Sequence, residues 1–454
     1  MLFFQVCKRD LESKVLVCAP QNYAADLITE LLLEEKFLAN SVLRFNAVSR
    51  SCFDISEKIL RVSNCTEKGD KLMLPLKSDI AKNQIVVSTL IASGRLVSAE
   101  LNDHFTHLFI DEAGFATEPE TVIPLALLDP RKGQLVLAGD PEQLGPILRS
   151  SLAISNRFDM SLLERLMNTS GPYVKDKQGS YDNKYVTKLK QSFRSHPDIL
   201  KVPNELFYQS ELQPCGNKKE VDELCESELL PKKGFPLIFH RVDGREEQEK
   251  SSPSWFNRLE VIEVINYVKK LIFGPSEVAP EDIGIISPYI QQVRKIRQAL
   301  NDEISEEDLA QIGAHTDEIT LGSVEKFQGN ERKVIILTTV RGDASNFKQD
   351  VKFNIGFLRS PKRFNVAITR AKALLIVIGN PIILCTDDKW RSLIRHIVSN
   401  GGYIGDPIPE QLLDESAIQR LTEEMNGASI NESCEATERS NFMLHQDDTF
   451  ERDV

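Results

Sequence analysis

The sequence contains no uninterrupted run of eighteen apolar residues and no pair of cysteines spaced as C-x-x-C. The first absence excludes a membrane-spanning helix, which needs roughly twenty such residues. The second argues against a zinc site or a disulfide framework, and the eight scattered cysteines indicate free thiols in a reducing compartment. The apolar run before Lys8 is too short for a secretory signal. We therefore expect a cytoplasmic protein without a membrane partner.

An excess of positive charge is also absent, because the net charge is −12. Residues 411–454 hold eleven acidic side chains and three arginines, a charge of −8, which leaves −4 for the first 410 residues. High polarity with little periodicity is typical of disorder, so we expect a disordered acidic tail over residues 406–454. The nearly balanced remainder can carry a local basic groove, and the net charge therefore does not exclude a nucleic-acid partner.

Two series of short, β-branched, apolar segments indicate two α/β domains in tandem. The first series comprises residues 14–20, 85–90, 106–114 and 134–140, and the second comprises 236–240, 282–289, 334–340 and 374–380. Helical patterns separate these segments, and strands buried on both faces between helices are typical of parallel sheets. We expect a first domain over residues 1–200 with a small helical insertion at about 34–84, a connection over 201–233 and a second domain over 234–405.

The segment 108-LFIDEAG-114 places two carboxylates at the carboxyl end of a strand, where open parallel sheets bind their ligands. Asp111 is suited to hold Mg²⁺ through its water shell, and Glu112 to position or deprotonate an attacking water. The alternative is an exposed helix start, where acidic side chains are common.

The next strand favours the hydrolytic interpretation. It ends in 138-AGDPEQLGP-146, and the amide of Gln143 can contact a γ-phosphate oxygen and the attacking water at once. A simple turn would explain the glycines and prolines of this segment. It would not explain the acidic pair one strand earlier.

Two arginines can supply positive charge to a phosphate. Arg194 lies in 192-SFRSHP-197 and Arg370 lies in 365-NVAITRAK-372. An arginine that contacts the transferred phosphate is worth ~10³–10⁵ in rate. Both could reach the acidic pair only if the two domains close on each other, and the alternative for each is a solvated surface charge.

The segment 319-ITLGSVEKFQGNER-332 offers a further set of ligand contacts. Gly329 allows the backbone to approach a ligand closely, and Glu331 could accept hydrogen bonds from ribose hydroxyls. Ser323 and Lys326 are suited to contact the phosphates of a nucleic acid. Taken alone, the segment is equally compatible with an ordinary loop before a strand.

Taken in chain order, these segments resemble the superfamily 1 helicases, and within them the RNA helicases of the nonsense-mediated-decay type. The matching segments are APQN (19–22), STL (88–90), DEAG (111–114), GDPEQLGP (139–146), SFRSHP (192–197), SPY (287–289), EKFQGNER (325–332) and NVAITRAK (365–372). The segments 231-PKKGFPLIFHRVDG-244 and 252-SPSWFN-257 resemble the Moloney-leukaemia-virus-ten and Armitage branch of RNA-silencing helicases. The resemblance implies two RecA-like motor domains.

The resemblance also implies roles for individual residues. Those expected to contact ATP are Gln143, Phe193, Arg194, Gly329, Glu331 and Arg370, with Phe193 stacked on the adenine. Those expected to grip RNA are Pro20, Asn22, Thr89, Pro288, Tyr289 and Ser323. The implied activity is ATP- and Mg²⁺-dependent 5′-to-3′ unwinding of RNA by a monomeric motor in RNA silencing or messenger RNA turnover. The implied partners are ribonucleoprotein or silencing-complex proteins, and the implied location includes ribonucleoprotein granules.

One element of the family pattern is missing. A phosphate-binding loop needs G-x-x-x-x-G-K-[ST], and Gly followed by Lys does not occur in this sequence. The family places this loop just before the segment that begins near Val15, so we expect an incomplete first domain, without one strand near the centre of its sheet. We therefore expect little ATP hydrolysis by this chain as written. A non-catalytic RNA-binding or scaffold isoform and a DNA helicase remain as alternatives.

Overall fold

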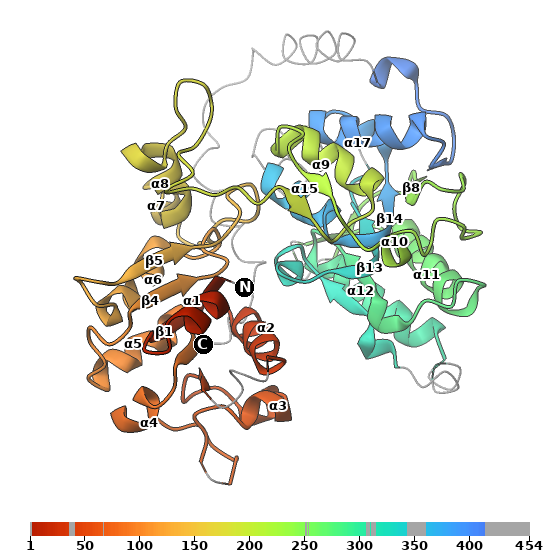
Figure 1. Cartoon of the computed structure of the whole chain (residues 1–454). Helices are drawn as coiled ribbons and strands as arrows, with labels where there is room; N and C mark the ends of the chain where they lie inside the picture. Colours follow the sequence, from red (N-terminus) through yellow and green to blue (C-terminus); the bar gives the residue numbers. More distant parts are fainter. Residues whose placement is uncertain are drawn as a thin grey trace. The chain divides into compact units, whose positions relative to one another are not determined.

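The computed structural model describes residues 2–35, 41–66, 68–249, 252, 254–305, 309, 315–342 and 360–413. The predicted acidic tail lies outside these residues from position 414 onward. The chain divides into two compact units, of which the first ends at Thr187 and the second begins at Lys188. Figure 1 colours the first unit from red to yellow and the second from green to blue.

The first unit is built on a five-stranded parallel sheet with the order β2-β3-β1-β4-β5. The strands are β1 (Val15–Ala19), β2 (Val42–Phe45), β3 (Ile85–Thr89), β4 (His107–Ile110) and β5 (Gln134–Leu137). β1 is buried at every position and lies at the centre. β5 forms one edge of the sheet, and its first two residues are exposed.

Alternate residues of β1 belong to two hydrophobic clusters, one on each face of the sheet. Leu16 and Cys18 pack with α5 (Leu90–Ser98). Val15 and Val17 pack with α1 (Leu2–Arg9) and α2 (Asn22–Leu33). This double burial explains why the strand reads as an unbroken apolar run, since no side chain of β1 faces water.

Residues 34–84, which we expected to form a small helical insertion, include the strand β2 as well as the short helices α3 (Glu57–Leu60) and α4 (Lys77–Ala81). β2 pairs in parallel with β3, and its residues Val42 and Phe45 are buried in the core. Part of this segment therefore belongs to the main sheet.

The second unit is built on a six-stranded parallel sheet with the order β12-β11-β13-β14-β8-β15. The strands are β8 (Leu237–Arg241), β11 (Ile283–Ile286), β12 (Thr320–Gly322), β13 (Arg332–Thr338), β14 (Ala371–Gly379) and β15 (Tyr403–Ile404). One face packs on α11 (Arg258–Phe273) and α12 (Ile290–Glu303). The helices α9 (Pro197–Phe207), α15 (Pro361–Ile368) and α17 (Asp388–Ser399) meet around Phe364, whose ring lies edge-on to Trp390.

Short elements fill the connections. They are α6 (Glu118–Val122), α7 (Ser151–Ser155), α8 (Leu162–Thr169), β6 (Gln191–Ser192), β7 (Gln213–Pro214), α10 (Lys218–Val221), β9 (Glu247–Gln248), β10 (Trp255–Phe256) and α16 (Pro381–Leu384). The prediction of two tandem α/β domains with parallel sheets is confirmed. Across the described ranges, no helix combines the length and apolar character that crossing a membrane requires.

A buried arginine fastens β2 to the start of α2. The Arg44 side chain is fully buried, and its Nε donates to Asp26 Oδ1 at 2.8 Å. Its Nη2 donates to Asn22 Oδ1 at 2.9 Å. Arg50 also pairs with Asp26, with an Nη2–Oδ2 distance of 2.6 Å. One carboxylate therefore neutralises two arginines, and removing it would leave a buried charge without its partner.

We predict that Asp26→Asn lowers the free energy of unfolding of the first unit by about 3 kcal/mol, the usual cost of breaking a buried pair. The exposed pair Lys82–Asp79 supplies the control, since Asp79→Asn should cost less than about 1 kcal/mol. Urea unfolding followed by far-ultraviolet circular dichroism measures both. The only two tryptophans, Trp255 and Trp390, lie in the second unit, so their fluorescence transition should stay in place. Equal midpoints for the two variants would contradict the prediction.

Candidate functional site

The predicted acidic pair lies at the carboxyl edge of the first sheet, fixed between two neighbouring strand ends. The amide of Asp111 donates to the carbonyl of Cys18 in β1 at 2.8 Å. The amide of Ala113 donates to the carbonyl of Ala138, just after β5, also at 2.8 Å. These bonds place the turn that follows β4 directly beside the loop that follows β5.

Two glycines allow these segments to touch. A Cβ atom on Gly114 would lie 2.9 Å from the carbonyl oxygen of Asp140, and one on Gly139 would lie 2.8 Å from the nitrogen of Gly114. Glu112, two residues before Gly114, has a φ of 51°, which lies in the left-handed region that non-glycine residues rarely adopt. Such strain is typical of functional sites, where the surrounding structure holds a side chain in a required direction.

Gln143 is oriented by a residue that the sequence analysis did not single out. Its Nε2 donates to Asp140 Oδ2 at 3.0 Å, while Asp140 Oδ1 accepts from the amide of Glu142 at 2.9 Å. Asp140 therefore positions the predicted phosphate sensor on the loop that touches the acidic turn. The spacing D-x-x-Q after the strand is the sequence signal that could have predicted this contact between Asp140 and Gln143.

The surroundings of Asp111 fit a bound cation. Burial raises the pKa of the Asp111 carboxyl, and the backbone amide of Glu112 opposes this only in part. Within the ranges that the structure covers, no lysine or arginine forms an ion pair with Asp111. A partly buried carboxylate without a cationic side chain is suited to hold a divalent ion through water.

The three residues of the first unit expected to grip RNA lie at the ends of adjacent strands. Pro20 follows β1, and Thr89 ends β3 opposite Ala19. The Thr89 hydroxyl accepts from the amide of Ala92 and caps α5, while Asn22 contacts Arg44. The structure therefore brings these residues together and also gives Asn22 and Thr89 roles in the local fold.

In the second unit, the structure brings together two of the residues expected to contact ATP. Arg194 and Glu331, 137 positions apart, form an ion pair, and Lys372 Nζ lies 2.7 Å from Glu331 Oε1. Burial alone would raise the pKa of Glu331, but Arg194 and Lys372 hold it below its usual value. Phe193, next to Arg194, leaves 69% of its surface exposed, so its ring is available for stacking.

Arg370 lies deeper than the sequence suggested. Only 1% of its surface is exposed, and its Nε donates to the carbonyl of Val366 at 3.2 Å. Its Nη1 points to the carbonyls of Phe327 and Asn330, at 3.5 and 3.4 Å. These residues flank Gly329, whose φ is 73°. In this conformation Arg370 supports the Gly329 loop, and contact with a phosphate would require it to leave these carbonyls.

Tyr289, one of the predicted RNA-binding residues of the second unit, belongs to a cluster with Arg341 and Trp255. Tyr289 follows Pro288 at the end of β11, and its hydroxyl accepts from Arg341 Nε at 2.8 Å. The Arg341 guanidinium lies over both rings, 4.8 Å from the centroid of Trp255 and 5.3 Å from that of Tyr289. Arg341 and Trp255 were not identified from the sequence.

Two further predicted nucleic-acid contacts differ in their surroundings. The Ser323 hydroxyl is buried and has no hydrogen-bond partner in the part of the chain that the structure describes, which suits a ligand contact. Lys326 is half-buried, and its Nζ donates to the carbonyl of Leu321 at 3.1 Å. Burial lowers its pKa, and Arg297 and Arg332 lower it further.

Arg341 follows a strained turn that a buried acid holds in place. Val340 is fully buried with a φ of 71°, an unfavourable value for a β-branched residue. Glu260 Oε2 accepts from the amide of Val340 at 2.9 Å, and Asn257 Nδ2 donates to the Val340 carbonyl at 3.1 Å. This pair of side chains from the start of α11 therefore fixes the direction in which Arg341 leaves β13.

Residues 54–151 and 158–382 each match a family model described as an AAA domain. The chain is 47% identical to the "Putative helicase mov-10-B.1" of Danio rerio over 94% of this chain and 43% of that protein. It is 42% identical to the human "RNA helicase Mov10l1" over 88% of this chain and 32% of that protein. It is 34% identical to the "Probable RNA helicase armi" of Drosophila melanogaster over 89% of this chain and 35% of that protein.

The chain thus spans less than half the length of these relatives. Among solved structures, the arterivirus nonstructural protein 10 (helicase) gives a TM-score of 0.37 at 12% identity, covering 86% of this chain and 58% of that one.

We predict that Glu260 makes the second unit less stable as the pH rises. Burial raises its pKa from 4.5 to about 8, although Thr338 and the amides of Thr339 and Val340 bind it. Between these values the native state keeps a proton that the unfolded state has lost, so the free energy of unfolding falls with rising pH. Glu260→Gln keeps an oxygen for these donors and should flatten this dependence.

Urea unfolding followed by tryptophan fluorescence, at several pH values from about 5 to about 8, measures the slope. Glu281→Gln, at an exposed site in the same unit, is the control and should leave the slope unchanged. An unaltered slope in Glu260→Gln would show that Glu260 is ionised throughout.

Proposed function

We propose, because the chain belongs to the superfamily 1 helicases of the Mov10 and Armitage branch, that it supplies the paired motor domains of an ATP-dependent RNA helicase. The observation that carries this proposal is the contact between the strained Asp111-Glu112 turn and the Asp140–Gln143 loop. Carboxylates for a metal and for water thus adjoin an amide suited to a γ-phosphate.

In this proposal ATP binds at the carboxyl edge of the first sheet. Asp111 would hold Mg²⁺, which would supply positive charge to the phosphates when bound. Glu112 accepts a proton from the attacking water, and Gln143 orients that water. The left-handed backbone at Glu112 directs the carboxylate, and the bond from Gln143 to Asp140 restricts the amide.

Arg194 and Arg370 of the second unit stabilise the charge that develops on the γ-phosphate, with Gly329 beside the phosphates and Glu331 near the ribose. Arg194 is held by Glu331 in the present conformation, so approach of a phosphate exchanges one anionic partner for another. Lys372 stays near Glu331 and neutralises it after that exchange. Phe193 stacks on the adenine.

RNA is the proposed polymer, gripped by Pro20, Asn22 and Thr89 in the first unit and by Pro288, Tyr289 and Ser323 in the second. Contacts of this kind address the phosphodiester backbone and need no particular sequence. Relative movement of the two grips during ATP turnover gives 5′-to-3′ translocation. We propose a cytoplasmic location that can include ribonucleoprotein granules. There the protein would act as a monomeric motor in RNA silencing or messenger RNA turnover, with ribonucleoprotein or silencing-complex partners.

The absence of G-x-x-x-x-G-K-[ST] from the 454 residues favours a second candidate function, RNA binding without catalysis. Backbone amides and a lysine from such a loop normally hold the β- and γ-phosphates. We propose that turnover requires such a loop in addition to these 454 residues, which match only 43% of the length of the Danio rerio relative. A DNA helicase is the competing interpretation, and a form of the protein that unwinds DNA duplexes in preference to RNA duplexes would support it.

We predict that a form extended upstream to include the loop hydrolyses ATP when RNA is added, and that the 454-residue chain does so at a far lower rate. In the extended form Glu112→Gln should lower kcat by ~10²–10⁴, the usual contribution of a general base. Glu100→Gln, at an exposed site in the same unit, should leave kcat unchanged. Turnover by the shorter chain that Glu112→Gln abolishes would refute the need for the loop.

We predict that Phe193→Ala raises KM for ATP about tenfold, because stacking on a base is worth about 1–3 kcal/mol. Phe193→Tyr keeps a ring and should leave KM unchanged. Leu189→Ala removes another exposed apolar side chain, 86% exposed, from the same segment and serves as the control. The readout is steady-state hydrolysis by the extended form; equal KM values for Phe193→Ala and Leu189→Ala would argue against stacking.

A further inference from the structure

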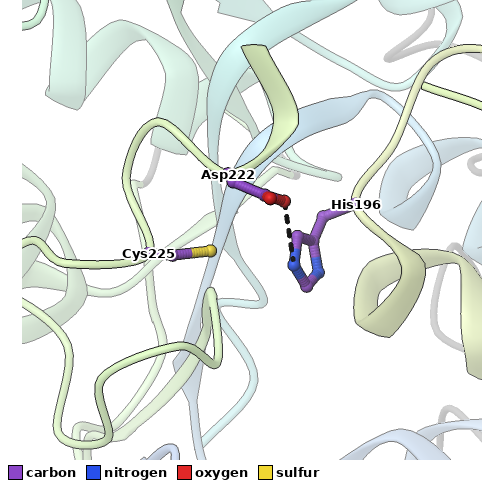
Figure 2. Close-up of side chains that lie close together, drawn as sticks. All are labelled: His196, Asp222 and Cys225. Atoms are coloured by element: carbon purple, nitrogen blue, oxygen red, sulfur yellow. Dashed lines mark ion pairs between the residues drawn. The ribbon is translucent and has the colours of Figure 1, made fainter. Parts of the chain in front are cut away.

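Three side chains that can bind a metal converge beside the start of α9. His196 precedes this helix, Asp222 ends α10, and Cys225 follows three residues later (Figure 2). Their ligand atoms all lie within 4.8 Å of one another. The fold builds this arrangement, because the amide of His196 donates to the carbonyl of Lys372 in β14 at 2.8 Å and α10 packs on the same strand.

The separation of His196 and Asp222 fits a shared ion better than a hydrogen bond. Nε2 and Oδ1 are 3.6 Å apart, beyond the usual limit of about 3.2 Å for a hydrogen bond. Two ligands that bind zinc tetrahedrally at about 2.1 Å lie about 3.4 Å from each other. The amide of Cys225 donates a hydrogen bond to the Asp222 carbonyl at 3.0 Å and so closes the turn that carries Cys225. A small movement of this turn would bring Cys225 Sγ to the same ion.

The electrostatic surroundings favour a cation. The charged groups that act on the Cys225 thiol are Asp222, Asp198 and Glu226, and all three are acidic. Their negative charge would stabilise a metal ion placed next to the sulfur.

We propose that His196 Nε2, an Asp222 carboxylate oxygen and Cys225 Sγ form a zinc site whose fourth position is filled by water. Nitrogen, oxygen and sulfur donors together suit Zn²⁺, whereas Mg²⁺ and Ca²⁺ require oxygen ligands. The pattern rules for cysteine spacing could not find this site, because its members come from two segments about thirty residues apart. The proposal is independent of the function proposed above.

Binding redistributes two protons. His196 Nδ1 accepts from the amide of Asp198 at 3.2 Å, so the neutral ring carries its proton on Nε2. Coordination through Nε2 moves that proton to Nδ1, which breaks the hydrogen bond from the Asp198 amide. Asp198 Oδ2, 3.7 Å from Nδ1, must then move closer to accept the new hydrogen bond. Cys225 releases its thiol proton to solvent as its sulfur binds the metal. Asp198 thus positions His196 without touching the ion.

The test uses the 454-residue chain, freed of metal by a chelator and then titrated with Zn²⁺ or with Co²⁺ as a spectroscopic probe. We expect one equivalent to bind, and cobalt to give a thiolate-to-metal charge-transfer band together with the visible bands of a tetrahedral ion. Cys225→Ser should abolish the charge-transfer band. His196→Gln and Asp222→Asn should each weaken zinc binding by at least about tenfold.

Cys215→Ser is the matched control, because Cys215 is also partly buried in the second unit but lies outside the group. It should keep both the stoichiometry and the band. Asp222 is half-exposed, so Asp222→Asn should fold normally, and unchanged circular dichroism and tryptophan fluorescence would verify this. Failure to bind zinc, or binding that Cys225→Ser and Asp222→Asn leave unchanged, would overturn the proposal. Competition by a large excess of Mg²⁺ should have no effect.

Discussion

Parallel pairing of the strands in both sheets is the constraint on which the candidate sites depend. In the first unit β1 pairs with β3 on one side and β4 on the other, all in the same direction. Their carboxyl ends therefore meet at one edge, and the segments after Ala19, Thr89 and Ile110 become neighbours. An antiparallel strand at any of these positions would have sent its turn to the opposite edge. This arrangement requires crossover connections, most of which carry helices, and these helices explain why the central strands are buried on both faces.

Buried ionisable side chains then fix the segments that parallel pairing only brings close together. Glu260, which keeps its proton in the native state, binds the backbone of the turn at Val340, and Arg370 binds the carbonyls on both sides of Gly329. Burial of a charge such as that of Arg370 costs several kcal/mol unless hydrogen bonds compensate for it. Apolar side chains of the same size would avoid that cost, but they could not hold a backbone amide or carbonyl in a chosen direction. These residues therefore contribute to the fixed geometry of the Val340 turn and the Gly329 loop more than to stability.

The sequence predicts the features that depend on neighbouring residues better than those that depend on residues far apart in the chain. The runs around Val17 and Ile336 revealed buried parallel strands because burial of both faces leaves a local pattern. The acidic turn was also local, and its place after β4 followed from the strand. The contact of Arg194 with Glu331, across 137 positions, has no local signature. The depth of Arg370 was likewise unpredictable, since the same motif is compatible with a side chain pointing to solvent or to the core.

The proposed zinc site and Arg194, the arginine proposed to contact ATP, share one short segment, and this has a mechanical consequence. Arg194 and His196 are separated by a single residue. The carbonyls of Phe193 and Ser195 lie close to Gly216, which follows β7, the strand paired with β6. The His196 amide is already bound to β14, so the backbone on the carboxyl side of Arg194 is fixed. A metal ion held by Asp222 and Cys225 would restrain the ring of His196 as well. Arg194 could then move between Glu331 and a phosphate only by rotation of its own side chain, without displacement of the backbone from which it projects.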